Sequence, residues 1–330
     1  MNNLIDVMRN SKMPWWCRDF FAKCEWLKLH SGKIEYVKSS KSSLCFGNPN
    51  SKGAAFGFLK DVFKFLGDDK QTEEMFINEA TSGDGHEYAR ITRLHSSALL
   101  PFLMFCQVPN KESLTIDIQG KQERFSKVHF EVKNWIQPND THPSNIDVVL
   151  ENENVILFLE SKFTEYFKRM RHVGIPNRFR GRVKKMLKQK GLTGLTMEKD
   201  ELVSSDYHYL EGVKQIVAHY MGIEFAATKG EGKFNHGGVQ QFLINGRDVY
   251  LGEILFDFRA FIHGDIRKGS TRAKCFEDYA GLYQEVTTAL SETSEMASPP
   301  RCLPEVLTYQ GLFTEYPLDE NVAQFYQIKK

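Results

Sequence analysis

The stretch that decides the fold is residues 130–162, FEVKNWIQPNDTHPSNIDVVLENENVILFLESK. Three segments, 128–134, 144–152 and 155–163, are rich in β-branched and aromatic residues and are separated by Asn, Asp and Pro residues that favour turns. This pattern predicts three consecutive short strands. The run 155–159 is wholly apolar, which is typical of a central strand covered on both faces.

Polar residues within these segments are the candidate functional residues. Glu131 lies in the first segment, Asp147 lies in the second, and Glu160 and Lys162 come at the end of the third. The two-residue period of a strand places Glu160 and Lys162 on the same face. Because charges beside a packed core are costly unless they are paired or bind a metal, this arrangement indicates a functional site.

These groups suit metal-assisted hydrolysis of a phosphodiester. Asp147 and Glu160 offer the hard oxygen ligands that Mg²⁺ prefers. Lys162 would orient a water molecule or stabilise charge on the phosphate, and Glu131 would hold a second metal or its water shell. The alternative is that the acids are solvated strand ends and that Glu160 and Lys162 form an ordinary ion pair worth less than about 1 kcal/mol.

The order Asp147, a spacer of twelve residues and then Glu160-Ser161-Lys162 resembles the PD-(D/E)XK nuclease superfamily, although Ile146 replaces the usual proline. The resemblance extends over roughly residues 126–262. It implies a restriction-endonuclease-like α/β fold with a mixed sheet flanked by helices. It also implies an Mg²⁺ site, in which Mn²⁺ can substitute, formed by Asp147, Glu160 and the carbonyl of Ser161.

The segment 206–221 is predicted to be a helix, because its apolar residues recur at helical spacing. His208, Gln215 and His219 fall on the opposite stripe, which is either a solvent face or directed at the site. The resemblance implies that Gln215 supports the site. The Gln-x-x-x-Tyr pattern of some branches of the superfamily is matched only in part, because His219 stands at the position of the Tyr. A zinc site formed by four histidines is a weaker alternative, since no ligand spacing supports it. These histidines are His172, His208, His219 and His236.

A strongly basic segment follows Lys162. Between residues 162 and 190 there are eleven Lys or Arg residues and one acid, Glu165. The part 178–190 predicts an amphipathic helix with a basic face that would neutralise phosphates along duplex DNA. The alternatives are a solvated helix or one on anionic lipid. The residues predicted to contact DNA are Lys168, Arg169, Arg171, Arg178, Arg180, Arg182, Lys184 and Lys185.

Composition places limits on the class of protein. The 330 residues are 41% hydrophobic, which is enough for a sizeable core, and 43 basic residues against 42 acidic ones leave the net charge uninformative. The six cysteines have no metal-site spacing. The N-terminus has no continuous apolar region of the kind a signal needs, and the longest apolar run, 98–106, is about half the length of a membrane span. We expect a protein of the reducing cytoplasm with no membrane partner.

The remaining chain predicts a mainly helical N-terminal region, 1–110, and a nuclease core with a C-terminal helical extension, 111–330, together one compact domain. Strands at 239–244 and 249–257, joined by Asn245-Gly246, should extend the sheet at an edge. Glu87 is an alternative to Glu131 as the supporting acid.

The sequence therefore predicts an Mg²⁺-dependent endonuclease of the restriction type acting on double-stranded DNA, as a possible homodimer. Two alternatives stay open. One is a DNA-repair or junction nuclease that uses the same residues, and the other is a catalytically inactive nucleic-acid-binding module.

Overall fold

The computed structural model describes residues 8, 13, 15–37, 43–47, 52–81, 90–109, 113–136, 143–190, 192, 194–228, 244, 246–261 and 273–328. Glu87, His236, Asn245 and the strand predicted at 239–243 lie outside the described residues. The chain divides into two compact units. The first comprises Met1–Leu114, Ser126–Glu131 and Tyr309–Lys330, and the second comprises Thr115–Phe125 and Val132–Thr308.

The first unit is mainly helical. Its elements are α2 (Trp15–Lys23), α3 (Glu25–Leu29), η1 (Ser31–Lys33), β1 (Ile34–Val37), β2 (Ser43–Phe46), α4 (Lys52–Val62), η2 (Lys64–Asp68), α5 (Lys70–Met75), η3 (Phe76–Ala80), α6 (Leu99–Phe105), α10 (Tyr309–Phe313) and α11 (Glu320–Phe325). Asp69 caps the start of α5, and its carboxylate accepts hydrogen bonds from the backbone N–H groups of Gln71 and Thr72. Such a cap satisfies N–H groups that a helix leaves without partners at its start.

Aromatic side chains hold this first unit together. Trp26 stacks on Phe63 with ring centroids 5.3 Å apart, and Phe325 from α11 lies 5.5 Å from Phe21. The indole Nε1 of Trp26 donates a hydrogen bond of 2.9 Å to Asn321. Because a buried indole N–H needs an acceptor, this bond fixes the C-terminal helix against α3. Phe21 and Trp26 thus pack into the core of the first unit.

The second unit carries the central sheet. Its elements are β3 (Leu114–Ile118), β4 (Lys121–Phe125), β6 (Ser144–Glu151), β7 (Val155–Lys162), η5 (Glu165–Phe167), β8 (Met170–Gly174), α7 (Asn177–Lys190), β9 (Leu195–Glu198), β10 (Glu201–His208), α8 (Leu210–Thr228), β11 (Asp248–Leu255), α9 (Ala273–Thr293), β12 (Arg301–Cys302) and β13 (Leu307–Thr308), while β5 (Lys127–Asn134) is shared between the units. The three strands predicted between residues 128 and 163 are confirmed as β5, β6 and β7.

Among the described residues, six strands form a mixed sheet in the order β12, β11, β7, β6 and β5, with β13 also paired to β11. Strands β6 and β7 are antiparallel, whereas β7 and β11 are parallel. Every residue of β7 is buried, which explains its continuous apolar run. The predicted fold class, a mixed sheet flanked by helices, is confirmed.

Strand β11 corrects the sequence analysis. The segment 249–257 was expected at an edge of the sheet, but β11 lies inside it, between β7 and the short strands β12 and β13. Its residues from Tyr250 onward are buried. A parallel pairing needs a crossover connection, and here α8 lies in that connection between β7 and β11.

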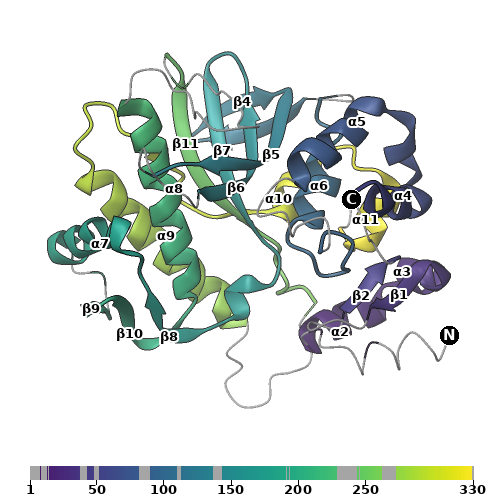
Figure 1. Cartoon of the computed structure of the whole chain (residues 1–330), viewed down its shortest axis with the longest axis horizontal. Coiled ribbons are helices and arrows are strands. Elements are labelled where there is room, and N and C mark those ends of the chain that lie inside the picture. Colours follow the sequence, from purple (N-terminus) through teal and green to yellow (C-terminus); the bar gives the residue numbers. More distant parts are fainter. Residues whose placement is uncertain are drawn as a thin grey trace. The chain divides into compact units, whose positions relative to one another are not determined.

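Helices α8 and α9 pack beside this sheet and α7 packs on both of them (Figure 1). The predicted helix at 206–221 is partly wrong, because residues up to His208 belong to β10 and α8 begins at Leu210. Gly222 allows a close approach, since a Cβ atom there would lie 2.3 Å from the side-chain oxygen of Asn134. Asn134 also donates a hydrogen bond of 2.9 Å to the carbonyl of His219. The position of α8 relative to the strands is thereby fixed.

Candidate active site

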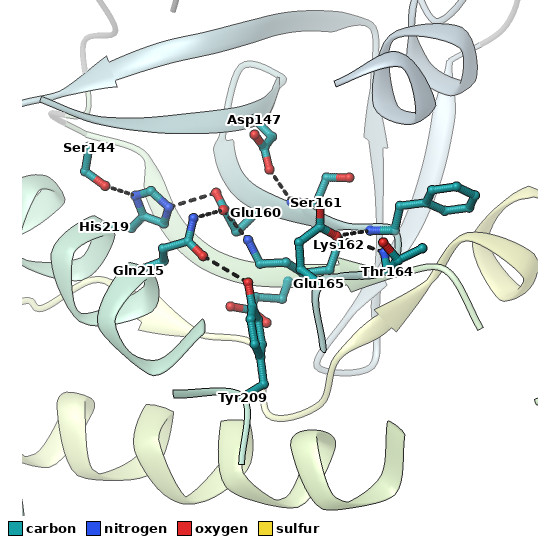
Figure 2. Close-up of polar contacts among 12 residues, drawn as sticks. Ser144, Asp147, Glu160, Ser161, Lys162, Thr164, Glu165, Tyr209, Gln215 and His219 are labelled. Atoms are coloured by element: carbon teal, nitrogen blue, oxygen red, sulfur yellow. Dashed lines mark hydrogen bonds and ion pairs between the residues drawn. The ribbon is translucent and has the colours of Figure 1, made fainter. Parts of the chain in front are cut away.

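The ends of β6 and β7 bring Asp147 next to the Glu-Ser-Lys sequence. The antiparallel ladder ends at the pair Val148 and Leu159, and Asp147 and Glu160 are the next residues along the two strands. One carboxylate oxygen of Asp147 accepts a hydrogen bond of 2.7 Å from the backbone N–H of Ser161 (Figure 2). The structure thus brings together three of the residues that the sequence predicted, Asp147, Glu160 and Lys162.

Glu160 accepts hydrogen bonds from three side chains of the site. The residue is 2% exposed, and its Oε1 accepts from the ammonium of Lys162 and from the amide of Gln215 at 2.8 Å. Oε2 lies 2.8 Å from Nε2 of His219. The hydroxyl of Tyr209 donates to Gln215 at 3.5 Å, which orients the amide so that its nitrogen faces Glu160. The prediction that Gln215 faces the site is consistent with this contact, and its function stays a prediction.

The charges at the site explain its protonation states. Burial alone would raise the pKa of Glu160, but the positive charge of Lys162 and the bond to His219 lower it to about 2. Burial also opposes the charged form of Lys162, yet Glu160 raises the pKa of the ammonium well above its ordinary value. The buried pair is therefore ionised at neutral pH.

His219 links Glu160 to the less buried side of the site. Its Nδ1 atom lies 2.8 Å from the hydroxyl oxygen of Ser144, and its Nε2 atom faces the ionised Glu160 (Figure 2). A carboxylate only accepts hydrogen bonds, so Nε2 must carry a hydrogen. Ser144 and Asp147 are half-buried, whereas Glu160, Lys162 and His219 are buried. Solvent and substrate would therefore approach from the side of β6.

A further acid, Glu253, was missed by the sequence analysis. It is paired in register with Glu160 across the parallel strands β7 and β11, and it is 0% exposed. Its Oε2 atom accepts a hydrogen bond of 2.5 Å from the hydroxyl of Tyr279 on α9. A signal was present, because Glu253 interrupts an otherwise apolar stretch, 249–256, as Glu160 ends one.

Burial is the main reason that Glu253 differs from an ordinary glutamate. It raises the pKa of this carboxyl to about 7, against the opposing effects of Lys162 and of the bond to Tyr279, while the charge of Glu160 adds to the rise. Near neutral pH, Glu253 thus exchanges between a neutral and an ionised form.

Glu131 lies on β5 in the first unit and its role stays a prediction. Its backbone has a φ of 49°, in the left-handed region that residues other than glycine rarely adopt. Such a conformation costs energy and persists only where the surroundings impose it.

The chemistry of the donor set fits a magnesium ion. Two carboxylates, Asp147 and Glu160, lie next to the last pair of the β6–β7 ladder, and the backbone N–H of Ser161 donates to Asp147. Mg²⁺ is commonly held by one or two carboxylates with water and phosphate oxygens completing its octahedron. Hydrogen bonds occupy three of the roughly four lone-pair positions of Glu160, which leaves one on Oε2. Within the described part of the chain, no group of three or more His, Cys, Asp or Glu side chains is arranged to hold a metal by itself.

The basic residues predicted to contact DNA fall into two groups. Four form ion pairs: Arg169 with Asp278, Arg180 with Asp200, Arg182 with the buried Glu224, and Lys185 with Glu295. Lys168, Arg171 and Lys184 are exposed, and Arg178 is half-buried. The apolar face of α7 is buried through Phe179, Val183 and Met186, which confirms the predicted amphipathic helix.

The fold and the site define a restriction-endonuclease-like α/β protein. The model of the family described as "Restriction Endonuclease associating with ARP" matches residues 63–236, just over half of the chain. The chain belongs to this family. Comparisons with curated proteins and with solved structures give no significant match. In the described residues, no helix is long and apolar enough to cross a membrane.

Proposed function

We propose that this chain is a metal-dependent endonuclease of the PD-(D/E)XK type that hydrolyses phosphodiester bonds in double-stranded DNA. The observation that carries the proposal is the position of Asp147, Glu160 and Lys162. The buried ammonium of Lys162 lies directly on the buried carboxylate of Glu160, and the carboxylate of Asp147 accepts a hydrogen bond from the backbone N–H of Ser161 between them. Family membership supports a nuclease function independently of this geometry.

The proposed roles follow from charge and burial. Asp147 and Glu160 would hold Mg²⁺, or Mn²⁺ in its place, together with the carbonyl of Ser161. When bound, such an ion lowers the pKa of a coordinated water and neutralises charge on the phosphate. Lys162 stays protonated, so its ammonium can stabilise negative charge that develops on the phosphate oxygens and orient the attacking water.

Gln215 and His219 have a positioning role in this proposal. Both donate to Glu160, one to each carboxylate oxygen, and the two bonds fix the plane of that carboxylate. Ser144 in turn contacts the other nitrogen of His219 and fixes the orientation of the imidazole ring. Small misplacements at a reacting centre are costly in rate, so these contacts would serve catalysis by orientation.

The basic segment after β7 would bind the DNA backbone. Lys168, Arg171 and Lys184 are exposed, and cations that contact phosphates make binding depend steeply on salt. The arginines and the lysine that already form ion pairs would contribute less, because each must first leave its carboxylate.

The test is a cleavage assay on linear duplex, branched and single-stranded DNA with Mg²⁺, Mn²⁺ or a chelator. The native protein should cut duplex DNA only with a divalent ion, and Glu160→Gln should abolish cutting. Preference for branched DNA would assign the chain to the repair or junction class instead. Failure to cut any substrate, with DNA binding retained, would refute the enzyme proposal and support a binding module.

A further inference from the structure

Lys162 has two buried acids within electrostatic range on the same face of the sheet. Glu160 holds its ammonium directly, while Glu253 and Asp147 act on it through their charges. Glu253 is in register with Glu160, and Leu255 is in register with Lys162. Glu253 therefore lies diagonally across from Lys162, a separation that a lysine side chain can span.

The two oxygens of Glu253 differ in their contacts. Oε2 accepts from Tyr279, whereas Oε1 is buried and has no hydrogen-bond partner among the described residues. A buried acceptor left unsatisfied costs about 1–3 kcal/mol, so such an atom calls for an explanation. The packing of α8 keeps this region tight, since a Cβ atom at Gly212 would lie 2.1 Å from the hydroxyl of Tyr279.

We propose that Glu253 is a second counter-ion of Lys162, which takes over the ammonium when Glu160 is engaged by another positive group. A buried ammonium without a carboxylate is strongly unfavourable. When the ion pair between Lys162 and Glu160 opens, Lys162 therefore needs a second carboxylate nearby. Tyr279 holds Glu253 by one oxygen and leaves the other available. The use of this exchange in catalysis rests on the proposed function, because a metal ion at Glu160 would compete with Lys162 for its charge.

The protonation behaviour of Glu253 agrees with this role. Glu160 raises the pKa of Glu253 and Lys162 lowers it, so removal of the charge on Glu160 favours the ionised form of Glu253. The carboxyl would thus gain its charge under the condition in which Lys162 needs it. Glu253 is a positioning residue in this account, since it acts on the substrate only through Lys162.

The first experiment is the crystal structure of Glu160→Gln at pH 8 without divalent ions or DNA. The variant should fold, and Lys162 Nζ should lie within hydrogen-bond distance of Glu253. An ammonium that stays on the new amide or turns to Asp147 would overturn the proposal. Loss of folding in this variant would overturn it as well, because Glu253 would then have failed to compensate the charge.

The second experiment is a double-mutant cycle by urea unfolding in chelator, with Glu160→Gln, Glu253→Gln and both together. The urea midpoint of the double variant should fall by more than the sum of the falls in the two single variants. Failure of only the double variant to fold is the extreme form of this result. Additive losses would contradict the proposal.

The matched control is the same cycle measured with Glu151→Gln in place of Glu253→Gln. Glu151 is also buried on the same sheet, but it pairs with Arg247 near the opposite end of β6. Its effect should add to that of Glu160→Gln. Because neither experiment uses metal or DNA, a failure to cleave DNA would refute the proposed function and leave these results unaffected.

Discussion

Replacement of Glu253 by glutamine should change how the stability of the protein depends on pH. The folded protein keeps a proton on Glu253 up to about pH 7, whereas the ordinary value for a glutamate is 4.5. Between these values the folded state binds more protons than the unfolded state, so stability falls as pH rises. The stability that the protonated Glu253 contributes is fully present below pH 4.5 and is lost above about pH 7.

The magnitude follows from the shift in pKa. A rise of the pKa from 4.5 to about 7 corresponds to a loss on the order of 3 kcal/mol, because one pKa unit is worth about 1.4 kcal/mol. Glu253 is 0% exposed, so solvent does not screen this effect. Glu160 behaves in the opposite way: its lowered pKa gives stability that is lost as pH falls from 4.5 to about 2. The two windows meet near pH 4.5 and can be measured separately.

The assay is urea unfolding of the native protein and Glu253→Gln at several pH values from 4.5 to 8, in chelator and at fixed ionic strength. The variant is neutral at all pH values, so the native protein should lose about 3 kcal/mol relative to it over this range. The control Tyr279→Phe removes a hydrogen bond that lowers the pKa of Glu253. The stability of this variant should therefore continue to fall to a higher pH than that of the native protein. Parallel curves for the native protein and Glu253→Gln would refute the reasoning.

Three further predictions concern packing, positioning and DNA binding. Gly222→Ala should destabilise the fold by about 1–3 kcal/mol, because the new Cβ would meet Asn134, whereas Gly281→Ala in α9, which has open space around it, should be neutral or slightly stabilising in thermal unfolding. His219→Ala should destabilise by about 1–3 kcal/mol, since it removes a hydrogen bond from a buried charged group, and Ser144→Ala should cost less because Ser144 is half-buried; equal losses in chemical denaturation would contradict this order. Lys184→Ala should reduce the salt dependence of DNA binding by about one unit of slope in a filter-binding or anisotropy titration, while Lys185→Ala, whose ammonium is paired with Glu295, should change the slope less; the reverse order would contradict the proposed contact surface.

Local sequence signals predicted much of this fold. The apolar run 155–159 and the turn residues around it correctly indicated β5 to β7, because a strand covered on both faces has few alternative patterns. The two charged residues that follow this run, Glu160 and Lys162, were correctly expected to lie side by side on one face of the strand. The helical spacing after Arg178 correctly indicated α7.

Non-local pairing was beyond the same signals. The position of β11 beside β7 depends on a crossover through α8, and nothing within residues 248–255 specifies a partner strand. Glu253 was missed for this reason, although its charge in an apolar segment was visible. Ser144, Tyr209 and Tyr279 reach the site from separate elements, and their residue types alone give no indication of it.

The most direct test of the account is the rate at which supercoiled plasmid is converted to nicked and linear DNA with Mg²⁺. The native protein and Lys214→Ala, a control that removes a half-buried lysine paired with Glu211 on α8, should cut at similar rates. Lys162→Ala should show no detectable cutting while it still binds DNA. Plasmid that stays intact with the native protein, or is cut equally by Lys162→Ala, would contradict the central claim.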